Sequence, residues 1–357
     1  MILSRYIAWN LAKGWLLVLL VLGAVFGLIA FIDQLEQTRF DYGALAAAQY
    51  TLFTLPNQLV ALAPVIALLG TIVALASMDR YNELTIVSCT GFALRQLLRA
   101  VLLPTLLLML LLWVLMEYGT PQLQQKAEHR RNELRFGGET WIPGGGVWST
   151  DGRRYIHLRK LSADGEPGSV TLFEFDERGA LTRSLRASRA DVDENRRWRF
   201  HNAREKRLHN GELVTKQHRE PFTVENLWSK NELPSLTLEA DSMTLSVLHS
   251  YTEYLNSINQ PSAKYANTYW QKLLMPITVL AMVLLATPIS ASISAGRDRS
   301  FGFNLGVGAL VGIFFYLGAQ IIYATGQIFA LSMPLVALAP ALIIVGVALV
   351  LLRRMRW

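Results

Sequence analysis

Residues 14–32, GWLLVLLVLGAVFGLIAFI, form an apolar segment without a single charged side chain. An α-helix rises about 1.5 Å per residue, so roughly 20 apolar residues cross a bilayer core about 30 Å thick. The segment therefore predicts a membrane-spanning helix. Further along the chain, four more stretches carry no charge: 42–78, 100–116, 273–296 and 300–352.

Together these stretches predict six membrane spans, because 300–352 is too long for one helix and divides near Gly326–Met333. The expected spans are 12–32, 54–76, 98–118, 273–294, 303–323 and 333–352. We expect the first to be retained, since its apolar run is longer than a signal-peptide core. Of the 357 residues, 52% are hydrophobic and 17% charged, against about 25% charged in soluble domains. This composition excludes a soluble globular enzyme.

The short loops between the expected spans differ in charge. The loops on one side carry Arg5, Lys13, Arg80, Arg95, Arg99, Arg297, Arg299, Arg353, Arg354 and Arg356, whereas those on the other side carry only Arg39. Basic loops stay in the cytoplasm, so both termini and the 77–97 loop are predicted to be cytoplasmic. The polar segment 119–271 is then predicted to lie outside. The net charge of +7 reflects this bias, so we expect no nucleic-acid partner.

Most of the charged side chains fall in 119–271, which predicts one polar domain between two groups of spans. Short β-branched and aromatic segments alternate there with turn pairs such as Asn210-Gly211, a pattern typical of a β-sandwich or jelly roll. The expected strands are 155–158, 170–175, 190–192, 198–200, 213–215 and 222–224. Residues 117–136 are expected to continue the third helix after a break at Pro121, and 242–260 to form a polar helix.

The predicted fold is thus an α-helical membrane protein with six transmembrane helices and an outer β domain, a sandwich or jelly roll, inserted between helices 3 and 4. We expect helices 1–3 in residues 1–118, with a short cytoplasmic helix at about 77–92. The β domain and its helical connectors take 119–271, and helices 4–6 take 272–357.

The sequence carries no motif for catalysis. No glycine is followed by lysine, so there is no phosphate-binding P-loop, and the histidines and the single Cys89 form no metal-binding motif. We expect neither a metal nor a cofactor on this chain. Glu117, at the outer edge of the third span, is the only clear ionisable residue in the spans. Since ion-coupled carriers usually hold charged groups deep in the membrane, the energy for any transport is expected to come from a partner.

The loop 77–97, SMDRYNELTIVSCTGFALRQL, is expected to form a short amphipathic helix that Asp79 caps and Gly91 ends. Such a helix suits docking into a groove on an ATPase, where apolar contact supplies area and a carboxylate fixes register. An interfacial helix lying on the membrane is the alternative. The residues expected to couple to an ATPase are Glu83, Leu84, Arg80 and Gly91.

Six motifs in combination are more specific than any one of them: FIDQL at 31–35, YTLFTLPNQL at 50–59, PVIALLG at 64–70, RYNELTIVSCTGF at 80–92, GGGVWSTDGRRYIHL at 144–158 and GIFFYLGAQI at 312–321. With the plan of three spans, β domain and three spans, they resemble the LptF/LptG permease family of the lipopolysaccharide export system. The resemblance covers essentially the whole chain, is strongest in 5–92, and is closer to the LptG branch.

The resemblance implies an ABC transporter in the bacterial inner membrane and makes the inserted domain a periplasmic β-jellyroll between transmembrane helices 3 and 4. Two permeases, LptF and LptG, form a heterodimer with two copies of the ATPase LptB, which binds ATP and Mg. Lipopolysaccharide is extracted from the membrane and passes to the β-jellyroll of a permease and of the single-span partner LptC, then to a periplasmic bridge. Glu83 matches the coupling-helix glutamate of the family.

The resemblance also implies basic residues that meet lipid A and core phosphates, since arginine pairs bidentately with phosphate. The candidates are Arg131, Arg130, Arg135 and Arg39; a solvated helix face is the alternative. The first span ends with Asp33, Glu36 and Gln37 where some relatives have lysines, so we favour the 126–135 helix.

A lateral gate is implied between the first span and the fifth span of the partner permease. Candidate gate or acyl-chain contacts are Leu22, Phe26, Leu62, Phe314, Phe315 and Tyr316, with plain lipid or helix packing as the alternative. A second functional hypothesis is a non-transporting ABC-linked mechanotransducer that acts on a periplasmic partner. The position of the domain after the third span favours the exporter.

Overall fold

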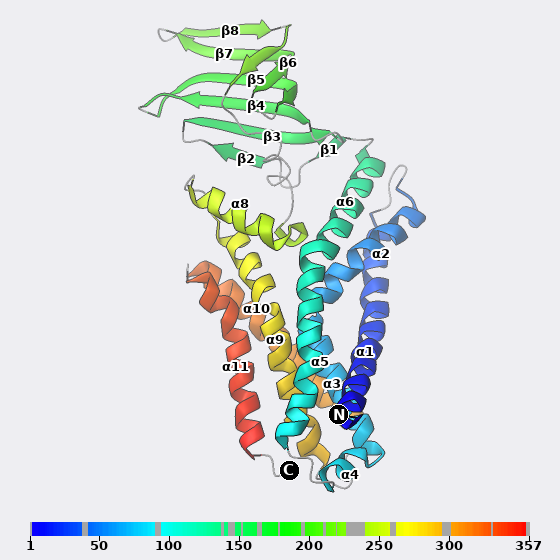
Figure 1. The fold of residues 1–357 in the computed structure, drawn as a ribbon. Helices are drawn as coiled ribbons and strands as arrows, with labels where there is room; N and C mark the ends of the chain where they lie inside the picture. The colour runs from blue at the N-terminus through cyan, green and yellow to red at the C-terminus, as the bar shows by residue number, and fades with distance from the viewer. Residues whose placement is uncertain are drawn as a thin grey trace.

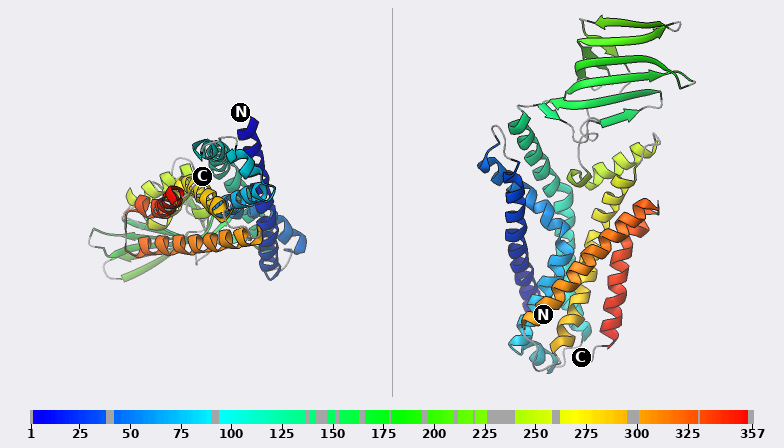
Figure 2. Two further views of the ribbon diagram at one scale, coloured as in Figure 1. Left: turned by 90° about the horizontal axis from the view of Figure 1, so that it is seen from below. Right: turned by 180° about the vertical axis from the view of Figure 1, so that it is seen from behind.

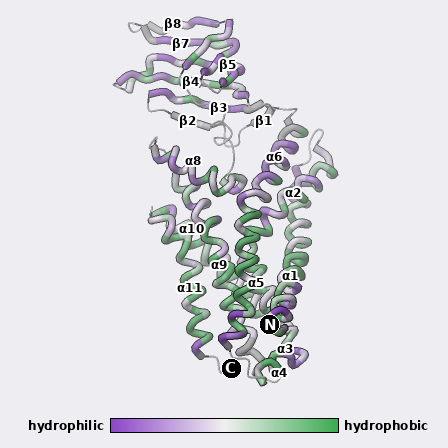
Figure 3. Tube along the Cα trace, viewed as in Figure 1, coloured by the Kyte–Doolittle hydropathy of each residue, from purple (hydrophilic) through white to green (hydrophobic). Residues whose placement is uncertain are grey.

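In the computed structural model, a bundle of long helices carries a β-sheet at one end (Figure 1). The two ends of the chain and the short helix α4 lie at the opposite end of the bundle. Hydropathy follows the same division, since the bundle is apolar along most of its length and the sheet is polar (Figure 3). The structure describes residues 2–37, 42–89, 94–136, 139–141, 147–150, 153–162, 166–177, 179–193, 197–209, 212–218, 220–225, 240–257, 262–294, 301–329 and 331–354.

The helices fall into two groups, one before and one after the sheet. The first comprises α1 (Ile2–Leu35), α2 (Ala44–Ala61), α3 (Ala63–Arg80), α4 (Glu83–Cys89), α5 (Leu94–Val114), the π-helix η1 (Leu115–Gly119) and α6 (Thr120–Phe136). The second comprises the 3₁₀ turn η3 (Ala240–Ser242), α8 (Leu245–Ser257), α9 (Ala263–Ser294), α10 (Phe301–Ile328) and α11 (Met333–Arg354).

Six helical segments of the described chain are long and apolar enough to cross a membrane, which confirms the number of predicted spans. They are Leu3–Leu35, Ala63–Arg80, Arg95–Arg131, Ala263–Ser290, Leu305–Ile328 and Met333–Arg353. The core of the bundle forms where the lower part of α1 meets α3, α5 and α9, and Ile7, Leu11 and Val101 are fully buried there. The protein is therefore a multi-pass membrane protein.

The prediction of one helix over 54–76 is wrong. The chain breaks at Leu62, whose ψ of 0° separates α2 from α3, and Pro64 lies in the first turn of α3. A proline is tolerated there because the first N–H groups of a helix have no intrahelical acceptor. The apolar pattern runs through the break without interruption, so hydropathy could not reveal it. α3 alone forms the second span, while α2 packs against α1 and α6.

The break predicted at Pro121 is also wrong. α5, η1 and α6 follow one another without interruption, and the irregularity is the wide π turn just before the proline. The N–H of Thr120 donates to the carbonyl of Leu115, five residues back. Such a turn shifts the hydrogen-bond register within a helix without ending it. Glu117 lies in this turn, directly after the uncharged stretch 100–116.

The inserted domain is an antiparallel sheet between α6 and α8, which confirms a β domain inserted between the helices. Its strands are β1 (Glu139–Trp141), β2 (Val147–Thr150), β3 (Arg154–Ser162), β4 (Pro167–Phe175), β5 (Leu181–Val192), β6 (Trp198–His201), β7 (Ala203–His209), β8 (Glu212–His218) and β9 (Phe222–Val224). Each predicted strand falls within one of these. The described strands are hydrogen-bonded into a single sheet in which β3, β4 and β5 are central.

The long strand β5 divides the sheet into two arms. Its first half pairs with β7, with Arg183 opposite Arg207, and its second half pairs with β6, with Val192 opposite Trp198. β6 then pairs with β9, and β7 with β8. The pairs β6–β9 and β7–β8 are therefore both attached to the same edge of β5.

One apolar cluster extends from the sheet to α8. Ile156, Leu158, Trp198 and Phe200 contribute from the strands and are fully buried, and Leu248 contributes from α8. Burying a large apolar side chain stabilises a fold by about 1.5–3 kcal/mol. The cluster therefore contributes strongly to the domain and includes the helix that follows it.

Candidate functional site

The chain between α3 and α5 reverses through a tight turn into α4. α3 continues through Asp79 to Arg80, so the prediction that Asp79 caps the short helix is wrong. The turn depends on Asn82, whose φ of 58° lies in the left-handed region that asparagine adopts more readily than most residues. Its N–H donates to the carbonyl of Asp79 at 2.8 Å, and its own carbonyl accepts from Ile86 at 3.0 Å. Glu83 thereby becomes the first residue of α4.

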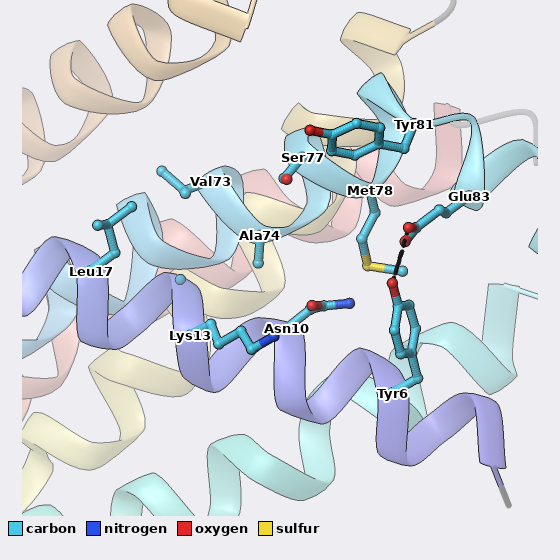
Figure 4. Close-up of a pocket in the computed structure, with 11 residues that line it drawn as sticks. Tyr6, Asn10, Lys13, Leu17, Val73, Ala74, Ser77, Met78, Tyr81 and Glu83 are labelled. Carbon is cyan, nitrogen blue, oxygen red and sulfur yellow. Dashed lines mark hydrogen bonds between the residues drawn. The ribbon is translucent and has the colours of Figure 1, made fainter.

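The carboxylate of Glu83 is held by Tyr6 of α1 (Figure 4). The Tyr6 hydroxyl lies 2.9 Å from each carboxylate oxygen and donates to them. The two residues are 77 positions apart, so this contact joins the first span to the helix between the second and third spans. Tyr6 was not among the predicted functional residues, because nothing in the local sequence around it indicates a partner so distant.

A pocket of about 280 Å³ opens between α1, α3 and the start of α4. Figure 4 shows Asn10 and Lys13 on α1 and Met78 on α3, with the Tyr6–Glu83 pair at one end. Hydrogen-bond donors on α1 and the carboxylate of Glu83 therefore line the same cavity, at the end of the bundle opposite the sheet.

At the wall of this pocket, which Gly14 lines, α1 and α3 cross in backbone contact. A Cβ atom on Gly14 would lie 2.3 Å from the carbonyl oxygen of Gly70, and one on Gly70 would lie 2.7 Å from the Cα of Trp15. The indole N–H of Trp15 donates to Thr71 Oγ1 at 3.0 Å in the same buried crossing. Small residues allow this approach in membrane helices. The crossing fixes α1 against α3 just above the Tyr6 contact.

The residues predicted to couple to an ATPase occupy different environments. Glu83 is partly exposed and Arg80 is exposed at the end of α3. Leu84 is only 7% exposed and packs into the core of this chain's own bundle, whereas Ile86 is 61% exposed. The outward apolar group of α4 is therefore Ile86. Gly91 lies outside the described residues.

Among the predicted phosphate contacts, Arg131 is the one with defined surroundings. It extends from α6 over the ring of Tyr50 on α2, with 4.7 Å from the guanidinium carbon to the ring centroid, and its Nη1 donates to the Tyr50 hydroxyl at 3.1 Å. Its Nε is shielded from solvent and has no hydrogen-bond partner among the described residues. A buried donor of this kind favours an additional acceptor. Arg130 is exposed beside it. Arg39 and the side chain of Arg135 lie outside the described part of the chain.

The predicted gate residues form two separate groups. Leu22 and Phe26 lie on α1, while Phe314, Phe315 and Tyr316 lie on α10. The upper halves of these two helices stand on opposite sides of the bundle (Figures 1 and 2). The structure therefore does not bring the two groups together within one chain. Leu62, the remaining candidate, is the half-buried residue at the break between α2 and α3.

Phe314 and Phe315 of α10 border an apolar groove of about 450 Å³ between α9, α10 and α11, whereas Tyr316 does not line it. Phe314 is 72% exposed at its edge, and Phe315 packs inward against the core of these helices. The side chains that line the groove are almost entirely aliphatic or aromatic. Its chemistry therefore suits hydrocarbon.

The described residues contain no group of three or more His, Cys, Asp or Glu side chains that could hold a metal ion. The most buried ionic cluster is in the sheet, where Glu205 accepts hydrogen bonds from Arg183, Arg207 and His218. Burial raises the pKa of the Glu205 carboxyl, but the hydrogen bonds from His218 and Arg207 and the charge of Arg183 outweigh it, so the pKa lies below its ordinary value. The cluster ties β5, β7 and β8 together.

Six spans, a β domain after the third and a short helix after the second define a multi-pass membrane protein with an inserted β domain. Residues 5–354 match the family of lipopolysaccharide export system permeases LptF/LptG, and the chain belongs to that family. It is 28% identical over 359 residues to the lipopolysaccharide export system permease protein LptG of Escherichia coli strain K12, covering 99% of this chain and 98% of that protein. It is 26% identical over 356 residues to LptG of Haemophilus influenzae, covering 99% of each chain. The predicted resemblance to this family and its LptG branch is confirmed.

Proposed function

We propose that the protein is the permease subunit of an ABC transporter that extracts lipopolysaccharide from the inner membrane and passes it to a periplasmic bridge toward the outer membrane. The observation that carries this proposal is the membership of nearly the whole chain in the LptF/LptG family, together with six spans and a β domain beyond one membrane surface. ATP hydrolysis and its Mg belong to a partner, since the sequence has no P-loop.

The partners in this proposal are LptF as the second permease, two copies of the ATPase LptB, and LptC. The arrangement of the gate residues supports a two-permease complex, because α1 and α10 present apolar side chains on opposite sides of the bundle. In such a complex α1 of one permease meets the fifth span of the other, and the gate lies at each meeting point. No nucleic acid is involved.

The proposed orientation has both termini and α4 in the cytoplasm and the sheet in the periplasm. Two observations support it. Under the positive-inside rule, the short loops that are rich in Lys and Arg lie in the cytoplasm, and the short loops on the other side carry only Arg39. The chain ends and α4 also share one end of the bundle, opposite the sheet (Figure 1).

The proposed mechanism is mechanical. The two ATPase subunits close on ATP and push α4 through Glu83 and the exposed Ile86. The Tyr6–Glu83 hydrogen bonds pass the displacement to α1, and the crossing at Gly14 and Gly70 serves as its pivot. The outer half of α1 then moves, the cavity between the permeases narrows, and the lipid leaves toward the sheet. Arg131 donates a hydrogen bond from its Nε, which has no partner among the described residues, to a lipid phosphate.

The test is ATP-dependent lipid transfer in a reconstituted complex. The full complex in proteoliposomes containing lipopolysaccharide would carry a photocrosslinking residue at Phe222, which packs against the apolar cluster of the sheet, or at the neighbouring exposed Thr223 as control. We expect a lipopolysaccharide adduct at Phe222 only with ATP, and little at Thr223. ATP hydrolysis without any adduct would reject the exporter and favour the mechanotransducer.

A further inference from the structure

The N-terminus of α8 is capped by a side chain from a different helix. Glu117 Oε2 accepts the N–H of Leu245 at 2.9 Å, and its Oε1 accepts the hydroxyl of Ser246. The first N–H groups of a helix have no intrahelical acceptor and carry the positive end of the helix dipole, so a carboxylate is favoured there. α8 already has a local cap, since Thr244 Oγ1 accepts the N–H of Val247 at 3.2 Å. Glu117 therefore does more than local capping requires: it ties α8 to the third span.

The turn that leads into α8 is held from two further helices. Lys272 of α9 donates from Nζ to the carbonyls of Asp241 and Met243, at 2.8 Å each. Gln125 of α6 donates to the carbonyl of Ser242 at 3.2 Å. Side chains from η1, α6 and α9 thus converge on residues 241–246, and we call Glu117, Gln125 and Lys272 the α8 clamp.

α8 also makes extensive apolar contacts. Leu248, Tyr251 and Leu255 are buried and belong to the cluster whose remaining members lie mainly on the sheet. Tyr251 also meets the ring of Tyr265 on α9 edge-on, with the centroids 4.7 Å apart. Figure 1 shows α8 lying between the sheet and the bundle. The helix is therefore joined to the bundle by polar bonds and by aromatic packing against α9, and it shares one apolar cluster with the sheet.

The helices that hold the clamp belong to different halves of the chain. η1 continues the third span, and α9 forms the fourth. Glu117 directly follows the uncharged stretch 100–116, and Lys272 directly precedes the uncharged stretch 273–296. Their bonds to one short segment fix it relative to both helices at once.

We propose that Glu117 and Lys272 are positioning residues that make α8 a rigid link, through which the third and fourth spans set the position of the β domain. Its use in transport rests on the proposed function: a relative displacement of these spans moves the sheet to receive the lipid. The attachment of α8 by Glu117 and Lys272 does not depend on the transport function and can be tested without measuring transport.

The test measures the distance between sheet and bundle in the full complex in lipid nanodiscs. In a Cys89→Ser background, nitroxide labels at Thr215→Cys on β8 and Ser332→Cys before α11 report this distance by double electron–electron resonance. We expect Glu117→Ala and Lys272→Met each to broaden the distribution by about two-fold, because the link loses its fixed attachment. Glu253→Ala on α8 and Lys264→Met on α9 are matched exposed controls and should leave it unchanged.

Glu117→Gln keeps one acceptor for the N–H of Leu245 and should give a distance distribution of intermediate width. If the alanine variant does not assemble, this variant tests the role of Glu117 in its place. Distributions as narrow as the controls in Glu117→Gln and Lys272→Met would overturn the clamp. In the crosslinking assay at Phe222, we expect clamp variants to keep ATP hydrolysis and lose about ten-fold of the adduct. If the protein without clamp substitutions gave no adduct, the proposed function would be rejected. The distance measurement would still show whether Glu117 and Lys272 position the sheet.

Discussion

The phenolic oxygen of Tyr6 lies 2.9 Å from both carboxylate oxygens of Glu83, which joins the start of the first span to the first residue of α4. A carboxylate acceptor makes these bonds stronger than bonds between neutral groups. Only eight residues further along α1, Gly14 meets the backbone of α3 at Gly70. In the proposed mechanism, a displacement of α4 would be passed to α1 close to a fixed crossing, and the longer outer part of the helix would follow.

Removing the Tyr6 hydroxyl should weaken this connection. We expect Tyr6→Phe to leave assembly intact and to lower the number of lipopolysaccharide molecules exported per ATP by roughly five-fold, which corresponds to about 1 kcal/mol for a partly exposed hydrogen bond to a charged group. The measurement is the ratio of lipid transfer to ATP hydrolysis in proteoliposomes. Tyr118→Phe, at an exposed position, is the control. An unchanged ratio in Tyr6→Phe would remove Tyr6 from the coupling path.

The crossing of α1 and α3 should not tolerate a methyl group. A Cβ on Gly70 would approach the Trp15 backbone to 2.7 Å, so we expect Gly70→Ala to lower the free energy of unfolding by about 1–3 kcal/mol, as overpacking does. Thermal unfolding in detergent measures this. Gly346→Ala is the matched control, because nothing lies within 4 Å of a Cβ there. Equal stability of the two variants would show that the helices can separate without cost.

Arg131 should matter through its shape as well as its charge. Arg131→Lys keeps the positive charge but loses the stacked guanidinium over Tyr50, and we expect roughly ten-fold less bound lipopolysaccharide. Native mass spectrometry of the purified complex measures the bound lipid. Arg186→Lys, at an exposed position on the sheet, should leave it unchanged. If Arg131→Lys binds as much lipid as this control, Arg131 has a packing role only.

The buried Glu205 should make the β domain sensitive to acid. Because its pKa in the folded protein is lowered from the ordinary 4.5, the charged form stabilises the sheet above that value, and this stability is lost as the pH falls through the lower folded-state pKa. Unfolding of the full chain, followed by tryptophan fluorescence from pH 6 downward, checks this. Glu205→Gln should be less stable at pH 6 and should lose part of the pH dependence. Glu177→Gln, in an exposed ion pair, should behave as the unmodified protein does.

The predicted strands lie where apolar and aromatic residues alternate. Of the strands that were not predicted, β1, β2 and β7, the last differs most clearly in composition. β7 reads AREKRLH, and Glu205 faces inward there with Arg183 and His218 as its partners. An ion cluster replaces the apolar side chains that the alternation rule requires. Only the pairing of β5, β7 and β8 brings these charges together, so the local pattern could not predict the strand.

The sequence by itself determined the six spans, the inserted β domain and the family. Charge is costly in hydrocarbon, so its absence over long stretches specifies membrane helices wherever they fold. Only the tertiary structure decided which side chains act together. Tyr6 and Glu83 are 77 residues apart, and Glu117 and Leu245 are 128 apart. Such contacts depend on where helix packing carries each backbone, and helix packing depends on small steric features such as Gly14, Gly70 and the π turn around Glu117, which hydropathy does not register.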